Sequence, residues 1–110
     1  MNGNSIGICV GHSRDGDQGA SSLGNITEWY YNWSVARHFA DALEVFGLEA
    51  VVFNKYEGKT YNTAIKWLAR ELKEREIDLA VELHFNAATP AAHGSEVLYW
   101  HSSSKGKRLA

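Results

Sequence analysis

The sequence predicts an α/β fold in which a mainly parallel sheet has helices packed on its faces. Three short apolar runs alternate with two segments of helical periodicity, and this βαβαβ order favours parallel strands joined by right-handed crossovers. The chain has 110 residues, of which 45% are hydrophobic, so a single core can accommodate its whole length. We therefore expect residues 1–110 to form one three-layer domain.

The first strand is expected over residues 5–10, where apolar side chains alternate with small ones. Cys9 lies in this run and is the only cysteine, so it cannot form an intrachain disulfide and is expected to be a small buried residue. A polar, glycine-rich loop follows over residues 11–25. Because it is longer than an ordinary connection, this loop is expected to have a function of its own.

The first helix is predicted over about residues 26–46, because apolar residues recur there at intervals of three and four. Asn25 or Thr27 can cap its beginning, and Gly47 ends it. The apolar stripe of this helix is expected to pack on the sheet.

The remaining elements complete the alternating order. A second strand is predicted over residues 49–54, a second helix over residues 62–75 and a third strand over residues 77–84. Residues 95–101 predict a fourth strand, and since no crossover helix precedes it, we expect this strand to lie antiparallel at an edge of the sheet. A short helix with a serine cap is predicted from about residue 102 onward.

The charge pattern argues against two classes of partner. Eleven basic and thirteen acidic residues give a net charge of -2 with mixed signs, so we expect neither nucleic acid nor a membrane surface as a partner.

The N-terminus has no basic segment followed by a long apolar run, and no window is apolar enough to cross a bilayer. We therefore expect this chain to have no signal peptide.

Two histidines follow predicted strands at what should be the same edge of the sheet. His12 comes directly after the first strand, His84 ends the third, and Glu28 lies in the opening turn of the first helix. Because the carboxyl ends of parallel strands meet at one edge, where α/β folds bind ligands, we expect these side chains to converge. Two imidazoles and one carboxylate are typical ligands of a catalytic zinc ion. The sequence therefore predicts a Zn2+ site at this edge.

Each of these residues also has an ordinary structural role to consider. A loop histidine such as His12 commonly forms a hydrogen bond, and the helix dipole alone favours an acidic residue at the position of Glu28. A buried histidine such as His84 needs partners for its ring nitrogens whether or not a metal is present. A metal-free α/β interaction domain is therefore an alternative, in which the convergence of the three residues is coincidental.

Further candidate residues lie near the predicted metal site. Glu82 precedes His84 by two residues and faces the same side of the sheet. It is expected to hydrogen-bond a ligand histidine or to act as a catalytic acid or base, and an ion pair with a covering helix is the structural alternative. His93, in the following loop, is a rival third ligand or a substrate contact. Tyr30 and Tyr31 are free to reach the surface and to line a cleft.

Several motifs occur in order along nearly the whole chain. They are Val10-Gly11-His12-Ser13, Asp17-Gln18-Gly19-Ala20, Glu28, Val81-Glu82-Leu83-His84-Phe85-Asn86-Ala87 and Gly94-Ser95-Glu96-Val97-Leu98-Tyr99. They resemble the motifs of the zinc-dependent N-acetylmuramoyl-L-alanine amidases, which include cell-wall autolysins and phage endolysins. The resemblance implies a phosphorylase/hydrolase-like three-layer architecture and gives the zinc ligands as His12, Glu28 and His84.

The resemblance also implies an activity and a substrate. Members of this family hydrolyse the amide bond between N-acetylmuramic acid and the L-alanine of the stem peptide, so the implied partner is peptidoglycan at the bacterial cell wall. We add Asn86, in the His-x-Asn motif, and His93 as predicted substrate contacts.

The resemblance places the catalytic glutamate of the family on a late strand, beyond the equivalent of Ala110. It therefore implies a domain that is incomplete at its C-terminal end, or a shortened one that recruits another carboxylate such as Glu82 as the catalytic residue. An alternative function follows, in which the chain is a catalytically inactive, zinc-containing module that binds peptidoglycan.

Overall fold

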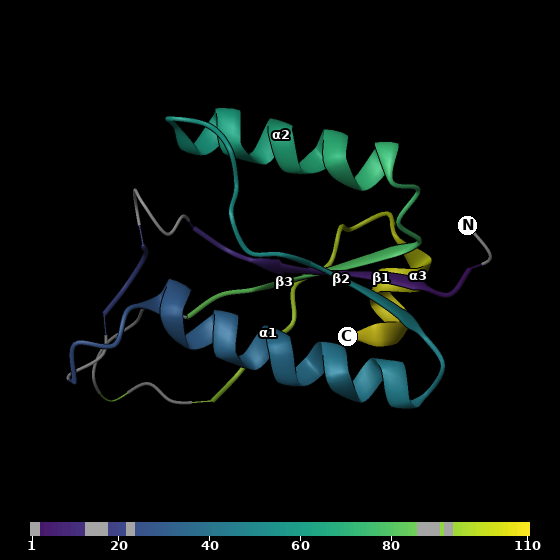
Figure 1. The fold of residues 1–110 in the computed structure, drawn as a ribbon, viewed down its shortest axis with the longest axis horizontal. Coiled ribbons are helices and arrows are strands. Elements are labelled where there is room, and N and C mark those ends of the chain that lie inside the picture. Colours follow the sequence, from purple (N-terminus) through teal and green to yellow (C-terminus); the bar gives the residue numbers. More distant parts are fainter. Residues whose placement is uncertain (1–2, 13–17, 22–23, 86–90, 92–93) are drawn as a thin grey trace.

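The structure is a computed structural model that describes residues 3–12, 18–21, 24–85, 91 and 94–110. Its elements are, in chain order, β1 (Ser5–Val10), α1 (Glu28–Val45), β2 (Glu49–Phe53), α2 (Tyr61–Glu74), β3 (Leu79–Leu83) and α3 (Ser104–Leu109). The strands form one sheet, and α1 and α2 cover its opposite faces (Figure 1). The predicted α/β fold with a parallel sheet is confirmed.

The strand β1 lies in the middle of the sheet, between β2 and β3. Both pairings are parallel, and Cys9 is in register with Phe53 of β2 and with Glu82 of β3. Because β1 is covered on both faces, Val10 is 0% exposed on one face and Cys9 is 1% exposed on the other. The carboxyl ends of β1 and β3 therefore lie side by side, in the arrangement that the sequence predicts.

Two apolar clusters hold the helices against the sheet, because successive side chains of a strand point to opposite faces. The cluster on the α1 side is formed by Ile8, Val10, Trp29 and Ala36. The cluster on the α2 side is formed by Cys9, Phe53, Tyr56 and Leu68. Full burial of an apolar side chain of this size contributes about 1.5–3 kcal/mol, so these clusters dominate the packing of the three layers.

The backbone of the preceding loop caps the beginning of α1. Thr27 occupies the N-cap position, but its side chain makes no capping hydrogen bond. Instead, the N–H of Glu28 donates to the carbonyl of Ala20 at 2.7 Å, and the N–H of Trp29 donates to the carbonyl of Gln18 at 3.1 Å. These bonds satisfy two of the free amides at the helix start and attach the loop to α1.

The other helix limits follow local sequence signals. The backbone leaves α1 through Gly47, which has a φ of +77°, a conformation that favours glycine. A capping box formed by Thr60 and Thr63 begins α2. The Ser103 hydroxyl accepts a hydrogen bond from the N–H of Gly106 at the start of α3, as expected for a serine cap.

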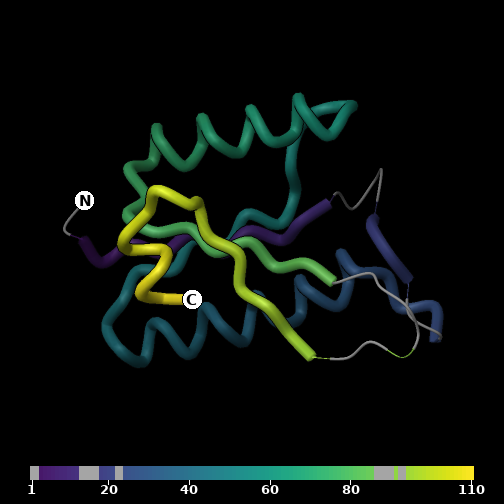
Figure 2. The backbone as a smooth tube through the Cα atoms, turned by 180° about the vertical axis from the view of Figure 1, so that it is seen from behind, coloured from purple at the N-terminus to yellow at the C-terminus, as the bar shows by residue number. Residues whose placement is uncertain are grey.

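The prediction of an antiparallel edge strand over residues 95–101 is wrong. Residues 94–100 form no strand, and the described sheet contains only β1, β2 and β3. Figure 2 shows this segment leading to α3 at an angle to β3. Val97, Leu98 and Trp100 are 65%, 83% and 71% exposed, so most of this continuous apolar run is uncovered, and it lies outside the described sheet.

The helices in the described ranges were compared with the requirements for spanning a bilayer. None of them combines the length and the apolar character that a bilayer-spanning segment needs.

Candidate metal centre

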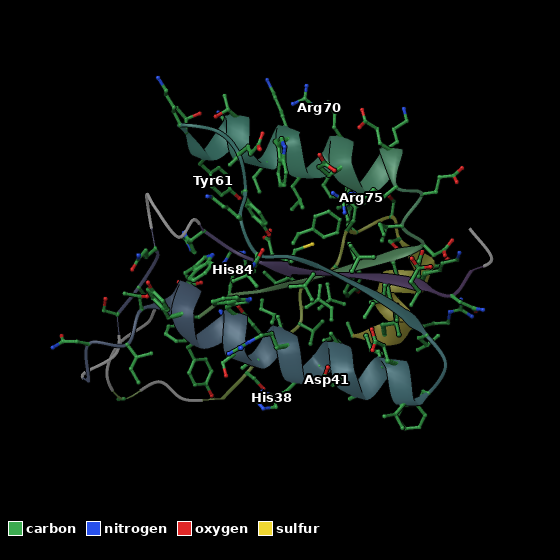
Figure 3. The ribbon with its side chains drawn as sticks, in the orientation of Figure 1. His38, Asp41, Tyr61, Arg70, Arg75 and His84 are labelled. Carbon is green, nitrogen blue, oxygen red and sulfur yellow. The ribbon has the colours of Figure 1, made fainter. Side chains whose placement is uncertain are left out.

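His12, Glu28 and His84 lie together at the carboxyl edge of the sheet. The N–H of Gly11 donates to the carbonyl of Leu83 at 3.3 Å, so β1 and β3 stay paired up to the residues that precede the two histidines. One potential ligand atom from each of the three side chains lies within 4.8 Å of the other two. Figure 3 shows His84 at this edge, near the beginning of α1. The fold thus brings together residues that are up to 72 positions apart, since 84 - 12 = 72.

The Glu28 carboxylate is buried and oriented by backbone amides. The residue is 2% exposed. Its Oε2 accepts a hydrogen bond from the N–H of Ala20 at 3.0 Å, and its Oε1 accepts one from the N–H of Phe85 at 2.8 Å. This places Oε1 3.4 Å from His12 Nε2 and 3.0 Å from His84 Nδ1. The carboxylate oxygen therefore lies between the two imidazoles.

His12 reaches the centre with an unusual backbone conformation. Its φ is +68°, in the left-handed region that residues other than glycine rarely adopt. The imidazole packs edge to face against that of His84, with ring centroids 5.3 Å apart and an interplanar angle of 85°. Backbone conformations of this kind are concentrated at functional sites, where the surrounding structure holds them in place.

Two glycines, Gly11 and Gly19, make room for these side chains, and both belong to the motifs given above. A Cβ at Gly11 would lie 2.2 Å from His84 Cε1. A Cβ at Gly19 would lie 2.5 Å from Glu28 Oε2 and 2.7 Å from His12 Cδ2. At these two positions the backbone therefore packs directly on the candidate ligands, and a side chain at either one would clash with them.

Glu82 contacts the other side of the His84 ring. Its Oε1 lies 2.5 Å from His84 Nε2, and its Oε2 accepts a hydrogen bond from the Tyr56 hydroxyl at 2.6 Å. Of the roles considered for Glu82, these contacts match the hydrogen bond to a candidate ligand histidine. Tyr56, in the loop after β2, was not found from the sequence, because nothing in its local pattern indicates this contact.

Comparison with protein families gives the classification. A family model described as N-acetylmuramoyl-L-alanine amidase matches residues 6–110, a range that contains all three candidate ligands. The chain belongs to this family. The resemblance seen in the motifs is therefore confirmed. The family supports, in general terms, an amidase that acts on peptidoglycan at the cell wall. No curated protein and no solved structure matches the chain.

Hydrogen bonding in the candidate metal centre shifts the pKa values of His84 and Glu82 in opposite directions. The hydrogen bond with Glu82 raises the pKa of His84 above its ordinary value, against the effect of burial, and Glu28 adds to the rise. Burial alone would raise the pKa of Glu82, but the hydrogen bonds from His84 and Tyr56 hold that pKa below its ordinary value. The two carboxylates thus favour the protonated form of His84 relative to a free imidazole, and a metal ion would compete with a proton for its ring nitrogen.

The predicted substrate contacts and the two remaining histidines do not join this centre in the part of the chain that the structure describes. Asn86 and His93, the predicted substrate contacts, are outside the described residues. His38 is on the exposed side of α1, where its Nδ1 is 2.8 Å from the carbonyl oxygen of Ser34. His101 packs against Trp100, with ring centroids 4.6 Å apart.

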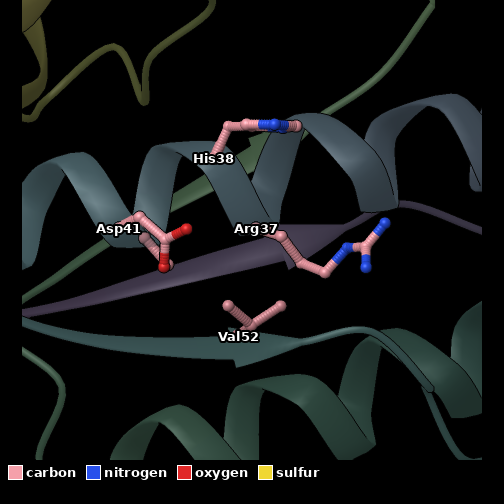
Figure 4. A pocket seen from close by; sticks show the side chains of 5 residues that line it. Arg37, His38, Asp41 and Val52 are labelled. Carbon is pink, nitrogen blue, oxygen red and sulfur yellow. The ribbon is translucent and has the colours of Figure 1, made fainter.

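An open surface pocket of the amidase is separate from this centre (Figure 4). It is lined by residues of α1 and β2, namely Arg37, His38, Ala40, Asp41 and Val52. None of these residues belongs to the candidate metal centre.

Proposed function

We propose that this amidase hydrolyses the amide bond between N-acetylmuramic acid and L-alanine in peptidoglycan, with a zinc ion held by His12, Glu28 and His84. The observation that carries this proposal is the convergence of their ligand atoms within 4.8 Å in a chain of the amidase family. Two imidazole nitrogens and one carboxylate oxygen suit zinc, and three protein ligands leave a fourth coordination position open, as in catalytic sites.

The environment of the three side chains also fits a zinc centre. A bound zinc ion supplies a Lewis acid for the amide carbonyl and ionises water near neutral pH. The backbone amides of Ala20 and Phe85 hold the Glu28 carboxylate in a fixed orientation. Glu82 contacts the nitrogen of His84 that faces away from Glu28, which is the carboxylate–histidine arrangement common around zinc.

An aromatic pair beside the centre is a candidate for substrate contact. The rings of Tyr31 and Phe85 have centroids 5.5 Å apart, and Phe85 directly follows His84. Tyr31 is 52% exposed, so its ring is accessible from solvent. We propose that this pair forms one wall of the substrate site, because aromatic side chains are common in such linings. Asn86 and His93 remain proposed substrate contacts.

For Glu82 we propose a positioning role in place of the catalytic one. Its two carboxylate oxygens are engaged, one by His84 and the other by Tyr56. A general base must reach the proton that it abstracts, and Glu82 would have to give up one of these bonds to do so. Its contacts instead orient the His84 ring.

Metal analysis and a product assay test this proposal together. The purified chain is expected to hold about one zinc ion, and His12→Ala and His84→Ala are expected to lose it, because two remaining ligands rarely retain zinc. His38→Ala, on the exposed side of α1, serves as the control and should keep the metal. Unchanged zinc content in both ligand variants would contradict the metal centre.

The product assay measures new L-alanine amino termini released from peptidoglycan. Because Glu82 is given a positioning role and no catalytic base is assigned among the described residues, the zinc-loaded wild type is expected to generate them slowly. The two ligand variants are expected to generate none. A zinc-loaded chain that binds peptidoglycan without releasing amino termini would overturn hydrolysis and support a binding module.

A further inference from the structure

We propose that Tyr56 is a positioning residue that strengthens metal binding by holding His84, through Glu82, in its ligand orientation. This inference rests on the proposed zinc centre and adds a residue to it. The Tyr56 hydroxyl donates its hydrogen bond to Glu82, so its effect on the metal is expected to pass through the Glu82 carboxylate.

A continuous set of hydrogen bonds connects Tyr56 to the candidate ligands. The Tyr56 hydroxyl donates to Glu82 Oε2 at 2.6 Å, and Glu82 Oε1 lies 2.5 Å from His84 Nε2. On the opposite side of the ring, His84 Nδ1 lies 3.0 Å from Glu28 Oε1. With Nδ1 directed at the metal position, Nε2 has to carry the proton and donate it to Glu82. The carboxylate thereby selects both the tautomer and the orientation of the ring.

Tyr56 is the rigid end of this connection. It is 6% exposed and belongs to the cluster on the α2 side, where its ring centroid lies 6.2 Å from that of Trp67. The side chains of Glu82 and His84 are 30% and 40% exposed. A glutamate with that exposure can turn toward water, and ordering it costs side-chain entropy. The hydrogen bond from a packed tyrosine removes this freedom before a metal binds, which is preorganisation.

The position of Glu82 in β3 explains why it needs such an anchor. Glu82 and His84 are two residues apart at the end of an edge strand, so they share one face of the sheet. The register places Cys9 beside Glu82, and Cys9 belongs to the same apolar cluster as Tyr56. A carboxylate in these surroundings needs hydrogen-bond donors, and Tyr56 and His84 supply one for each oxygen.

The test compares the zinc affinity of Tyr56→Phe, Glu82→Gln and the double variant at one fixed pH. Competition with a chromophoric chelator gives the dissociation constant, and the absorption spectrum of the Co2+-loaded protein reports the ligand geometry. Tyr56→Phe keeps the buried ring and removes only the hydroxyl. We expect its zinc affinity to fall about 10-fold and that of Glu82→Gln to fall about 10-fold to 100-fold, as for other outer hydrogen bonds to metal ligands.

The double variant identifies the route of the effect. If Tyr56 acts through Glu82, adding Tyr56→Phe to Glu82→Gln should weaken zinc binding no further. Fully additive losses would overturn the proposed route. An unchanged zinc affinity in Tyr56→Phe would overturn the role of Tyr56 itself.

Two control variants separate positioning from general destabilisation. Tyr61→Phe removes a hydroxyl from a tyrosine that is 71% exposed, and it should leave zinc affinity unchanged. Phe53→Leu alters the same apolar cluster without touching Glu82, and it should lower the free energy of unfolding while zinc affinity is kept. A loss of zinc affinity in Phe53→Leu equal to that in Tyr56→Phe would contradict positioning.

The wild type distinguishes this inference from the proposed function. A wild-type chain that binds zinc while Tyr56→Phe binds it equally well defeats only the inference about Tyr56. A wild-type chain that binds no zinc defeats the metal centre and the inference together.

Discussion

Gly19 shows how closely the backbone approaches the candidate ligands. Its φ is +79°, and a Cβ at this position would lie within 3 Å of both Glu28 and His12. Gly47 has almost the same φ, +77°, but a Cβ there would have nothing within 4 Å. Substitutions at the two glycines therefore distinguish the energetic cost of a left-handed backbone from the effect of a side chain that contacts the candidate ligands.

Gly19→Ala is expected to weaken zinc binding, whereas Gly47→Ala should leave it unchanged. Both variants place a side chain in the left-handed region and should lower the free energy of unfolding by about 1–2 kcal/mol. Only the methyl group at position 19 pushes against Glu28 and His12. Zinc titration and urea unfolding of the two variants measure the two effects separately. Equal zinc affinity would refute the role given to Gly19.

The candidate ligands could be predicted from the sequence, but their supporting residues could not. His12, Glu28 and His84 adjoin the ends of regular elements, and a parallel sheet brings such ends together. Tyr56 is 26 positions from Glu82 and lies in a loop whose path depends on the packing of α2. No periodicity encodes that contact, so it becomes visible only in three dimensions.

At the scale of elements, Asp78 ties the beginning of β1 to the residues before β3. Its carboxylate accepts hydrogen bonds from the Ser5 N–H at 3.0 Å and from the Ser5 hydroxyl at 2.6 Å. The Ser5 hydroxyl in turn accepts a bond from the Asp78 N–H at 3.0 Å. These bonds join the amino ends of two paired strands and so help to set their register.

Asp78→Asn is expected to destabilise the fold at pH 7 and to have a smaller effect in acid. The hydrogen bonds from Ser5 hold the pKa of Asp78 below its ordinary value of 3.8. A lowered pKa in the folded state gives stability that is present above the unfolded pKa and is lost as pH falls through the folded one. Urea unfolding at pH 7 and pH 3 measures this difference, with Asp41→Asn on α1 as the control. An equal loss at both pH values would rule out a contribution from the charge.

The helices and strands were largely predictable from the sequence. Helical and strand periodicities located the strands of the described sheet and the two helices that cover it. Residues 95–101 show where prediction from local sequence fails. Their run of apolar and aromatic residues from Val97 to Trp100 is typical of a strand, but a strand also needs a neighbour for its amides, and in the described chain this segment has none. Local pattern indicates what a segment can form, and tertiary pairing decides whether it does.

At the scale of the whole molecule, the reactivity of the Cys9 thiol shows whether α2 has separated from the sheet. The residue is 1% exposed in the central strand, beneath α2. Burial, followed by the nearby charge of Glu82, raises the pKa of the Cys9 thiol to about 12. The thiol is therefore both covered and protonated at neutral pH, and a thiol reagent can reach it only when the packing opens.

Zinc is expected to slow the labelling of Cys9 at pH 7.5. The proposed ligands come from three segments, so a bound ion favours the closed molecule over any state in which these segments separate. At a free zinc concentration 100 times the dissociation constant, stabilisation is about 2.7 kcal/mol and labelling through unfolding should slow about 100-fold. His84→Ala should show no such protection. Labelling that is equally fast with and without zinc in the wild type would contradict a centre that joins these segments.

The placement of β3 beside β1 also governs when the centre can form during synthesis. His12 and Glu28 leave the ribosome early, but the third candidate ligand follows a strand that adds to the far side of the sheet only after the second crossover is made. A nascent chain that stops before residue 84 has just two of the three donors. Under the proposed assignment, the complete set of metal ligands is therefore available only after residue 84 has been made.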